Sequence, residues 1–144
     1  MAGVILVRDV MTRNVKSVRP DSSVMEAIRK MNKFEIGSII VVQGGRPVGI
    51  ITERDILRRI VEQRLDPLVV KAREIMSSPI TTIREDVAVE EAAEMMTKRR
   101  IKKLPVVSNG RLIGMVTATD LMRSAPKLVG LLEGLMWTRS TPET

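Results

Sequence analysis

Hydrophobic and polar positions follow the same order twice along the chain, over residues 7–60 and again over residues 72–125. The two stretches align without a gap, and about a third of the aligned positions are identical. Chance similarity between helical segments would need gaps and would not keep the glycines in register. We therefore interpret the chain as two repeats, with a linker over residues 61–71 and a C-terminal helix and tail over residues 126–144.

Each repeat predicts the order strand, helix, strand, strand, helix. The helices are indicated by apolar residues that share one face, and the central strands by runs rich in valine and isoleucine. Such a unit is too small to bury its own sheet face, so we expect an α/β (α+β) fold in which the two repeats pack sheet to sheet as one pseudo-symmetric module. The expected strands are 15–18, 37–42 and 48–51, then 80–83, 104–107 and 112–116, and the last helices are 53–63 and 118–124.

Turn and cap residues refine this pattern. Tight hairpin turns are expected at residues 43–46 and 108–111. Ser23 and Glu26 have the spacing of a capping box at the first long helix. Ala88 stands where Ser23 stood, so the second helix has a weaker cap and we expect Asp86 to serve instead.

The tail carries its own apolar stripe. Leu128, Leu131, Leu132 and Leu135 fall at helical spacing, which predicts a short helix over residues 127–137. This stripe can pack on its own module or against a second subunit. Residues 138–144 are expected to be frayed.

Composition excludes several kinds of chemistry. The 144 residues contain neither cysteine nor histidine, which removes disulfides, thiolate metal sites, zinc sites and histidine-based triads. The scattered carboxylates form no nucleophile and base pair, so we expect no enzyme. The first residues have neither a basic region nor a long apolar run, so we expect no signal peptide, no membrane span and a cytoplasmic protein.

Charge leaves an alternative function open. A net charge of +7 fits a basic nucleic-acid-binding protein as well as a protein that binds a small anion. The chain contains one Phe, one Trp and no Tyr, which leaves almost nothing on which exposed bases could stack. This scarcity argues against nucleic acid, and salt dependence would separate the two classes.

The junction between the last strand and the last helix of each repeat is the candidate chemical site. Residues 49–55 read Gly-Ile-Ile-Thr-Glu-Arg-Asp, and residues 114–120 read Gly-Met-Val-Thr-Ala-Thr-Asp. Asp55 and Asp120 could each accept two hydrogen bonds from vicinal ribose hydroxyls, and Thr52 or Thr117 lies beside backbone N–H groups that favour a phosphate. Thr-x-x-Asp is also an ordinary helix cap, and both roles can hold together.

These features resemble a tandem pair of cystathionine beta-synthase (CBS) domains, also called a Bateman module. The resemblance rests on the duplicated Gly-apolar-apolar-Thr-x-x-Asp stretch, on residues 104–107 (Leu-Pro-Val-Val) before a hairpin, and on residues 24–27 (Val-Met-Glu-Ala). It implies a regulatory module that binds AMP, ADP, ATP or a related adenosyl ligand such as S-adenosylmethionine in clefts between the repeats. It also implies a homodimer paired through its helices, with output to an unidentified effector protein or through the oligomeric state.

The resemblance implies composite sites as well. One would join the turn of Thr117 and Asp120 to residues of the first repeat: Met11, Lys16, Ile36 and Gly37. The other would join the turn of Thr52 and Asp55 to residues of the second repeat: Met76, Thr81, Ile101 and Lys102.

A basic run makes the two sites differ. Residues 98–103 read Lys-Arg-Arg-Ile-Lys-Lys, either a solvated helix end or a phosphate-facing segment. By the resemblance, Lys102 and Lys103 face phosphates in the site of Thr117 and Asp120, whereas the matching pair in the first repeat is uncharged. We expect this site to prefer phosphorylated ligands, with Arg54 partly compensating in the other site.

Overall fold

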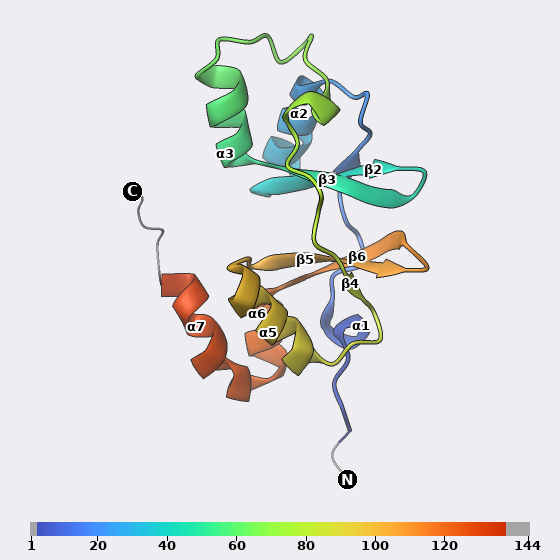
Figure 1. Ribbon diagram of the computed structural model, residues 1–144, viewed down its shortest axis with the longest axis vertical. Helices are drawn as coiled ribbons and strands as arrows, with labels where there is room; N and C mark the ends of the chain where they lie inside the picture. Colours follow the sequence, from blue (N-terminus) through green and yellow to red (C-terminus); the bar gives the residue numbers. More distant parts are fainter. Residues whose placement is uncertain (1–2, 138–144) are drawn as a thin grey trace. The chain divides into compact units, whose positions relative to one another are not determined.

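The computed structural model describes residues 3–137 (Figure 1). The chain divides into two compact units, each built mainly from one repeat. The first-repeat unit comprises residues 15–80 and 110–112, and the second-repeat unit comprises the residues up to 14, 81–109 and those from 113 onwards. Each unit is described by itself below.

The first-repeat unit is a three-stranded sheet with helices on one face (Figure 1). The sheet order is β1-β2-β3, with β1 parallel to β2 and β2 antiparallel to β3. Apolar residues of α2, β2, β3 and α4 form its core, which includes Val24, Ile39 and Ile51. The elements are β1 (Ser17–Val18), α2 (Val24–Phe34), β2 (Ser38–Gln43), β3 (Arg46–Thr52), α3 (Glu53–Ile56), a π-helical turn (Leu57–Val61) and α4 (Ala72–Ile75).

The second-repeat unit has the same plan with an added tail. Its sheet order is β4-β5-β6, with β4 parallel to β5, and α5 and α6 cover one face (Figure 1). The core includes Met96, Leu104 and Leu121, all with no exposed surface. The elements are α1 (Val7–Val10), β4 (Ile83–Arg84), α5 (Val89–Arg99), β5 (Lys103–Ser108), β6 (Arg111–Thr117), α6 (Ala118–Ser124), a 3-10 turn (Pro126–Leu128) and α7 (Val129–Trp137).

The segments that lead into the two repeats are exchanged. α1 precedes the first repeat in sequence, but Val7 lies in the core of the second-repeat unit and donates its backbone N–H to Val87 O at 2.8 Å. α4 precedes the second repeat, but Ala72 donates to Ser22 O at 2.7 Å in the first-repeat unit. Each unit therefore includes the leader segment of the other repeat. The mixed α/β class and the two repeats predicted from the sequence are confirmed.

The predicted hairpin turns are confirmed by their backbone angles. Gly44 and Gly45 have φ of 60° and 83°, and Asn109 and Gly110 have φ of 53° and 79°. Two successive positive φ values define the turn that best matches the twist of a two-residue hairpin.

The caps differ as predicted, with one correction. Ser23 caps α2, because its hydroxyl accepts the N–H of Glu26 at 3.1 Å, whereas Ala88 gives α5 no side-chain cap. The expectation that Asp86 takes over this role was wrong. Its carboxylate instead accepts a hydrogen bond from Arg84 Nε at 3.0 Å. Asp86 prefers this charged partner two residues away, and α5 begins without a side-chain acceptor.

The tail is a 3-10 turn followed by α7 rather than one continuous helix. The 3-10 turn begins at Pro126, and α7 begins three residues later. Leu128 and Leu132 are buried in the core of the second-repeat unit, and Leu135 packs against it. Packing on its own module is thus confirmed for these three residues, whereas Leu131 is 41% exposed. The expected fraying of residues 138–144 lies outside the described residues.

Candidate functional site

The two Thr-x-x-Asp turns share one backbone arrangement. In the first, Thr52 Oγ1 accepts the N–H of Asp55 at 3.1 Å, and Asp55 Oδ2 accepts the N–H of Thr52 at 2.9 Å. In the second, Thr117 and Asp120 form the same two bonds at the same lengths. These reciprocal bonds are a capping box, so the capping interpretation of both turns holds.

Close contacts explain the glycine that opens each motif. A Cβ atom at Gly49 would lie 2.5 Å from Sδ of Met76, and one at Gly114 would lie 2.6 Å from Sδ of Met11. A side chain at either position would displace the methionine of the leader, and at Gly114 it would also lie 2.9 Å from the backbone oxygen of Thr12, so glycine suits the strand where the methionine crosses it. The structure thus brings Met76 to the turn of the first repeat and Met11 to the turn of the second.

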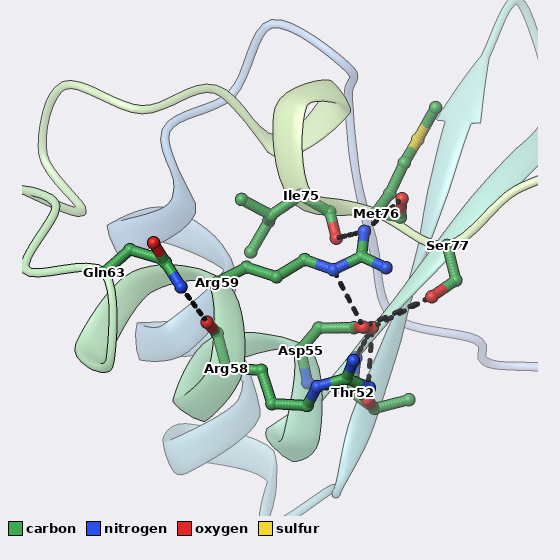
Figure 2. Close-up of polar contacts among 8 residues, drawn as sticks. All are labelled: Thr52, Asp55, Arg58, Arg59, Gln63, Ile75, Met76 and Ser77. Carbon is green, nitrogen blue, oxygen red and sulfur yellow. Dashed lines mark hydrogen bonds and ion pairs between the residues drawn. The ribbon is translucent and has the colours of Figure 1, made fainter.

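Asp55 lies in a dense polar network (Figure 2). Oδ2 accepts bonds from the backbone and hydroxyl of Thr52 at 2.9 and 3.1 Å, and Oδ1 accepts one from Ser77 Oγ at 3.2 Å. Arg59 Nε lies 3.9 Å from Oδ1, and its Nη1 donates to Ile75 O at 3.1 Å. The carboxylate is buried, with 9% of its side chain exposed. Asp55 therefore links the segment that leads into the second repeat, through Ser77, to the sheet and helices of the first-repeat unit.

Asp120 has a sparser environment. Within the described part of the chain its polar contacts are the N–H of Thr117 at 2.9 Å and an ion pair with Arg123, whose Nη1 lies 3.9 Å from Oδ1. The Arg123 side chain is 75% exposed, which makes this pair weak. The Asp120 side chain is 17% exposed, about twice the fraction of Asp55. Within residues 3–137 its Oδ1 accepts no hydrogen bond, which leaves it acceptor capacity to spare.

Other predicted residues lie against the turn of their own repeat. Gly37 O accepts the N–H of Glu53 at 3.1 Å, and Lys102 O accepts the N–H of Ala118 at 2.8 Å. The preceding residues, Ile36 and Ile101, are partly buried. Grouping Lys16, Ile36 and Gly37 with the second turn, or Thr81, Ile101 and Lys102 with the first, joins residues of different units and stays a prediction.

The matched positions beside the turns carry opposite charges. A Cβ atom at Gly37 would lie 3.3 Å from Oε1 of Glu53, so a carboxylate covers this backbone in the first-repeat unit. In the second repeat Lys102 replaces Gly37 and Ala118 replaces Glu53. Lys102 and Lys103 are exposed, as is Arg54 at the start of α3. A phosphate would meet Glu53 as well as Arg54 beside the first turn, but only positive charge, from Lys102 and Lys103, at the matched positions beside the second.

Two groups outside the turns have shifted acidity. A hydrogen bond from Arg84 lowers the pKa of Asp86 below its ordinary value. A hydrogen bond from Lys127, whose Nζ lies 2.8 Å from Glu90 Oε2, lowers the pKa of Glu90 in the same way. The second pair links the 3-10 turn of the tail to the first turn of α5.

Sequence reasoning missed three residues near the sites. Arg59 follows Asp55 by four residues on the helix, a spacing that could have indicated the ion pair. Ser77 carries no such signal, because its contact with Asp55 depends on the exchange of leaders. Phe34 lies under Lys16, whose Nζ is 4.2 Å from the ring centroid, so a cation–π contact holds a predicted ligand residue.

Neither a metal-binding cluster nor a membrane-spanning helix occurs within residues 3–137. No group of three or more histidine, cysteine, aspartate or glutamate side chains is arranged to hold a metal ion there. No helix in that range is both long enough and apolar enough to cross a membrane.

Comparison with known proteins identifies the repeat. The family model described as CBS domain matches twice, at residues 7–62 and 72–127. The uncharacterized protein MK0525 of Methanopyrus kandleri is 40% identical over 131 residues, which cover 90% of this chain and 67% of that protein. The inosine-5'-monophosphate dehydrogenase of Methanocaldococcus jannaschii is 35% identical over 117 residues, which cover 80% of this chain and 22% of the enzyme.

A solved structure has the same fold. Hypoxic Response Protein I, in a crystal structure with two coordinated zinc ions, superposes with a TM-score of 0.77 and 28% identity. The match covers 84% of this chain and 99% of that protein. Nearly the whole of that protein thus corresponds to the two repeats described here.

Proposed function

The chain belongs to the CBS-domain family, and from this premise we propose that it is a regulatory module that binds an adenine nucleotide, AMP, ADP or ATP, or a related adenosyl ligand such as S-adenosylmethionine. Paired CBS domains are regulatory and often bind adenosyl ligands. The relative from Methanocaldococcus jannaschii carries such a segment beside the rest of an enzyme. Here we propose a non-enzymatic role, in which ligand binding changes the affinity for a partner protein or a second copy.

The observation that carries the proposal is the acceptor capacity of Asp120. A carboxylate held by a capping box is fixed in orientation, and its outward oxygen can accept hydrogen bonds from a ribose. Met11 and Ile101 supply apolar surface in the same unit, as most small-molecule sites do. Lys102 supplies a positive charge next to the turn, which favours a phosphorylated ligand.

A homodimer is part of the proposal. Six large apolar side chains are exposed in the first-repeat unit, and a second copy could cover them. In the second-repeat unit the tail covers the corresponding helical face. A second copy could therefore bury more apolar surface at the first repeat. The exposed residues of the first-repeat unit are Phe34, Leu57, Val61, Leu65, Leu68 and Val69.

A thermal-shift panel tests the proposal. The purified chain would be heated with AMP, ADP, ATP, S-adenosylmethionine, NAD or a short DNA duplex. A ligand that binds the folded state raises the midpoint in proportion to the logarithm of its concentration, so we expect a rise with at least one adenosyl compound. A rise with the duplex alone, lost steeply with added salt, would instead support the nucleic-acid-binding alternative.

A further inference from the structure

We infer that the chain binds one adenosyl ligand, at Asp120, because Ser77 already occupies the place on Asp55 that a sugar hydroxyl would take. The inference rests on the proposed function and adds a stoichiometry to it. The first Thr-x-x-Asp turn then has a structural role, in which Asp55 holds the segment around Ser77 against the first-repeat unit; we call this turn the latch. The second turn is the ribose site.

The acceptor capacity of Asp55 is mostly used. A carboxylate offers about four lone-pair directions. The backbone N–H and the hydroxyl of Thr52 bond Oδ2, and the hydroxyl of Ser77 lies 3.2 Å from Oδ1 and 3.4 Å from Oδ2. Arg59 Nε forms an ion pair with Oδ1 at 3.9 Å, a distance too long for a hydrogen bond. A ribose could bind there only by displacing protein donors.

A ribose that displaced Ser77 from Asp55 would gain little binding free energy. A sugar hydroxyl would replace the Ser77 hydroxyl, so one neutral donor is exchanged for another of similar strength. The exchange would also disturb Arg59, whose Nη1 bonds Ile75 O at 3.1 Å and holds the leader to the first-repeat unit. Glu53 would repel an attached phosphate, since its carboxylate lies over Gly37.

Asp120 lacks the equivalents of both blocking residues. Thr12 stands at the position of Ser77 and makes the matching backbone pairing, with its N 2.8 Å from Met115 O, but it is exposed, and within residues 3–137 its hydroxyl makes no hydrogen bond to Asp120. Ser124 stands at the position of Arg59, and its hydroxyl donates to Leu121 O at 3.1 Å. The nearby cation, Arg123, is largely exposed and can move aside. A ribose would therefore add hydrogen bonds at Asp120 without removing any.

Isothermal titration with AMP tests the stoichiometry. We expect the wild type to bind one AMP per chain, and a triple variant, Ser77→Ala with Arg59→Ser and Glu53→Ala, to bind two, because it removes both groups beside Oδ1 of Asp55 and the carboxylate that would repel the phosphate. Ser78→Ala is the matched control, since Ser78 is the exposed neighbouring hydroxyl and should leave the stoichiometry at one. Two bound AMP in the wild type, or one in the triple variant with its fold verified by circular dichroism, would overturn the inference.

A second pair of variants separates this inference from the proposed function. Asp120→Asn should weaken AMP binding by about tenfold or more, the loss typical of a hydrogen bond to a charged group, and Asp55→Asn by far less. A larger loss from Asp55→Asn would overturn the one-site assignment while leaving the proposed function intact. If AMP and every other adenosyl compound of the panel fail to bind the wild type, both ideas are rejected.

Discussion

The two Thr-x-x-Asp turns begin their helices with the same pair of hydrogen bonds but lie in different surroundings. Asp55 is buried and bonded to Ser77, whereas Asp120 is partly exposed and keeps a free side. The duplication preserved the cap and changed the neighbours. A repeated motif therefore identifies a shared local structure, and the chemistry of each copy depends on what the rest of the chain places against it.

The helical faces of the two units also differ, because one is covered by the chain's own tail and the other is open. In the second-repeat unit the tail buries Leu128 and Leu132 against α5 and α6. In the first-repeat unit the matched face carries an open groove of about 790 Å³ lined by Ile28, Ile36 and Leu57 among others. Leu57 is 61% exposed there. One repeat covers its helices with its own chain and the other does not.

The largest expected effect comes from breaking the covered face. Leu132→Ala removes a side chain with no exposed surface, and we expect the free energy of unfolding to fall by about 2–5 kcal/mol. Leu131→Ala in the same helix is the control, because that side chain is 41% exposed and should cost much less. Urea denaturation measures both. Equal losses would contradict the assignment of the tail to the second-repeat unit.

The next effect compares the two carboxylates. Asp55→Ala leaves the partly buried donors of Thr52 and Ser77 unpaired and removes the ion pair of Arg59, so we expect a loss of about 2–4 kcal/mol in unfolding free energy. Asp120→Ala removes mainly a cap, at a cost of about 1 kcal/mol. The same denaturation experiment without ligand gives both values. A larger loss for Asp120→Ala would show that the latch had been assigned to the wrong turn.

A smaller effect concerns the caps of the long helices. Ser23→Ala should cost about 1 kcal/mol, because it removes the acceptor of the N–H of Glu26. Ala88→Ser should recover about 0.5–1 kcal/mol at the matched position of α5. Thermal melting of both variants against the wild type would check this. The prediction fails if the serine at position 88 brings no gain.

The smallest effect is a dependence on pH. The pKa of Glu90 is lowered by Lys127, so the folded state favours the charged carboxylate and the pair stabilises it at neutral pH. This stabilisation is lost as the pH falls through the lowered pKa. Glu90→Gln should therefore cost less than about 1 kcal/mol at pH 7 and nothing well below pH 4.5, the ordinary value. Melting curves of the wild type and of Glu90→Gln at both pH values measure this. A stability difference between the two proteins that is the same at both pH values would contradict the ion pair.

The sequence predicted the features that depend on nearby residues. The hairpins at Gly44–Gly45 and Asn109–Gly110, the Ser23 cap and the strand and helix order all arise from local chemistry, and the structure has them. The break in the tail also had a local cause in Pro126, whose fixed φ suits the first position of a new helical turn. The sequence predicted a helix that begins after Pro126, at residue 127, and in the structure α7 begins two residues later, after this turn.

The features that depend on distant contacts were not predictable in this way. The exchange of leaders brings residue 77 to residue 55, and no spacing in the sequence indicates that contact. The expected asymmetry rested on Lys102 and Lys103, and the structure adds a different cause in the use of Asp55 by the protein itself. The π-helical turn after α3, with Glu62 N bonded to Leu57 O at 2.9 Å, also lay outside the predicted regular helix.

The central claim is that Asp120 binds the hydroxyls of a ribose, and it is tested most directly by comparing AMP with 2'-deoxy-AMP. If Asp120 accepts both vicinal hydroxyls, the wild type should bind the deoxy compound about tenfold or more weakly, and Asp120→Asn should discriminate far less. Equal affinities of the wild type for the two nucleotides would contradict the claim. So would discrimination that survives in Asp120→Asn.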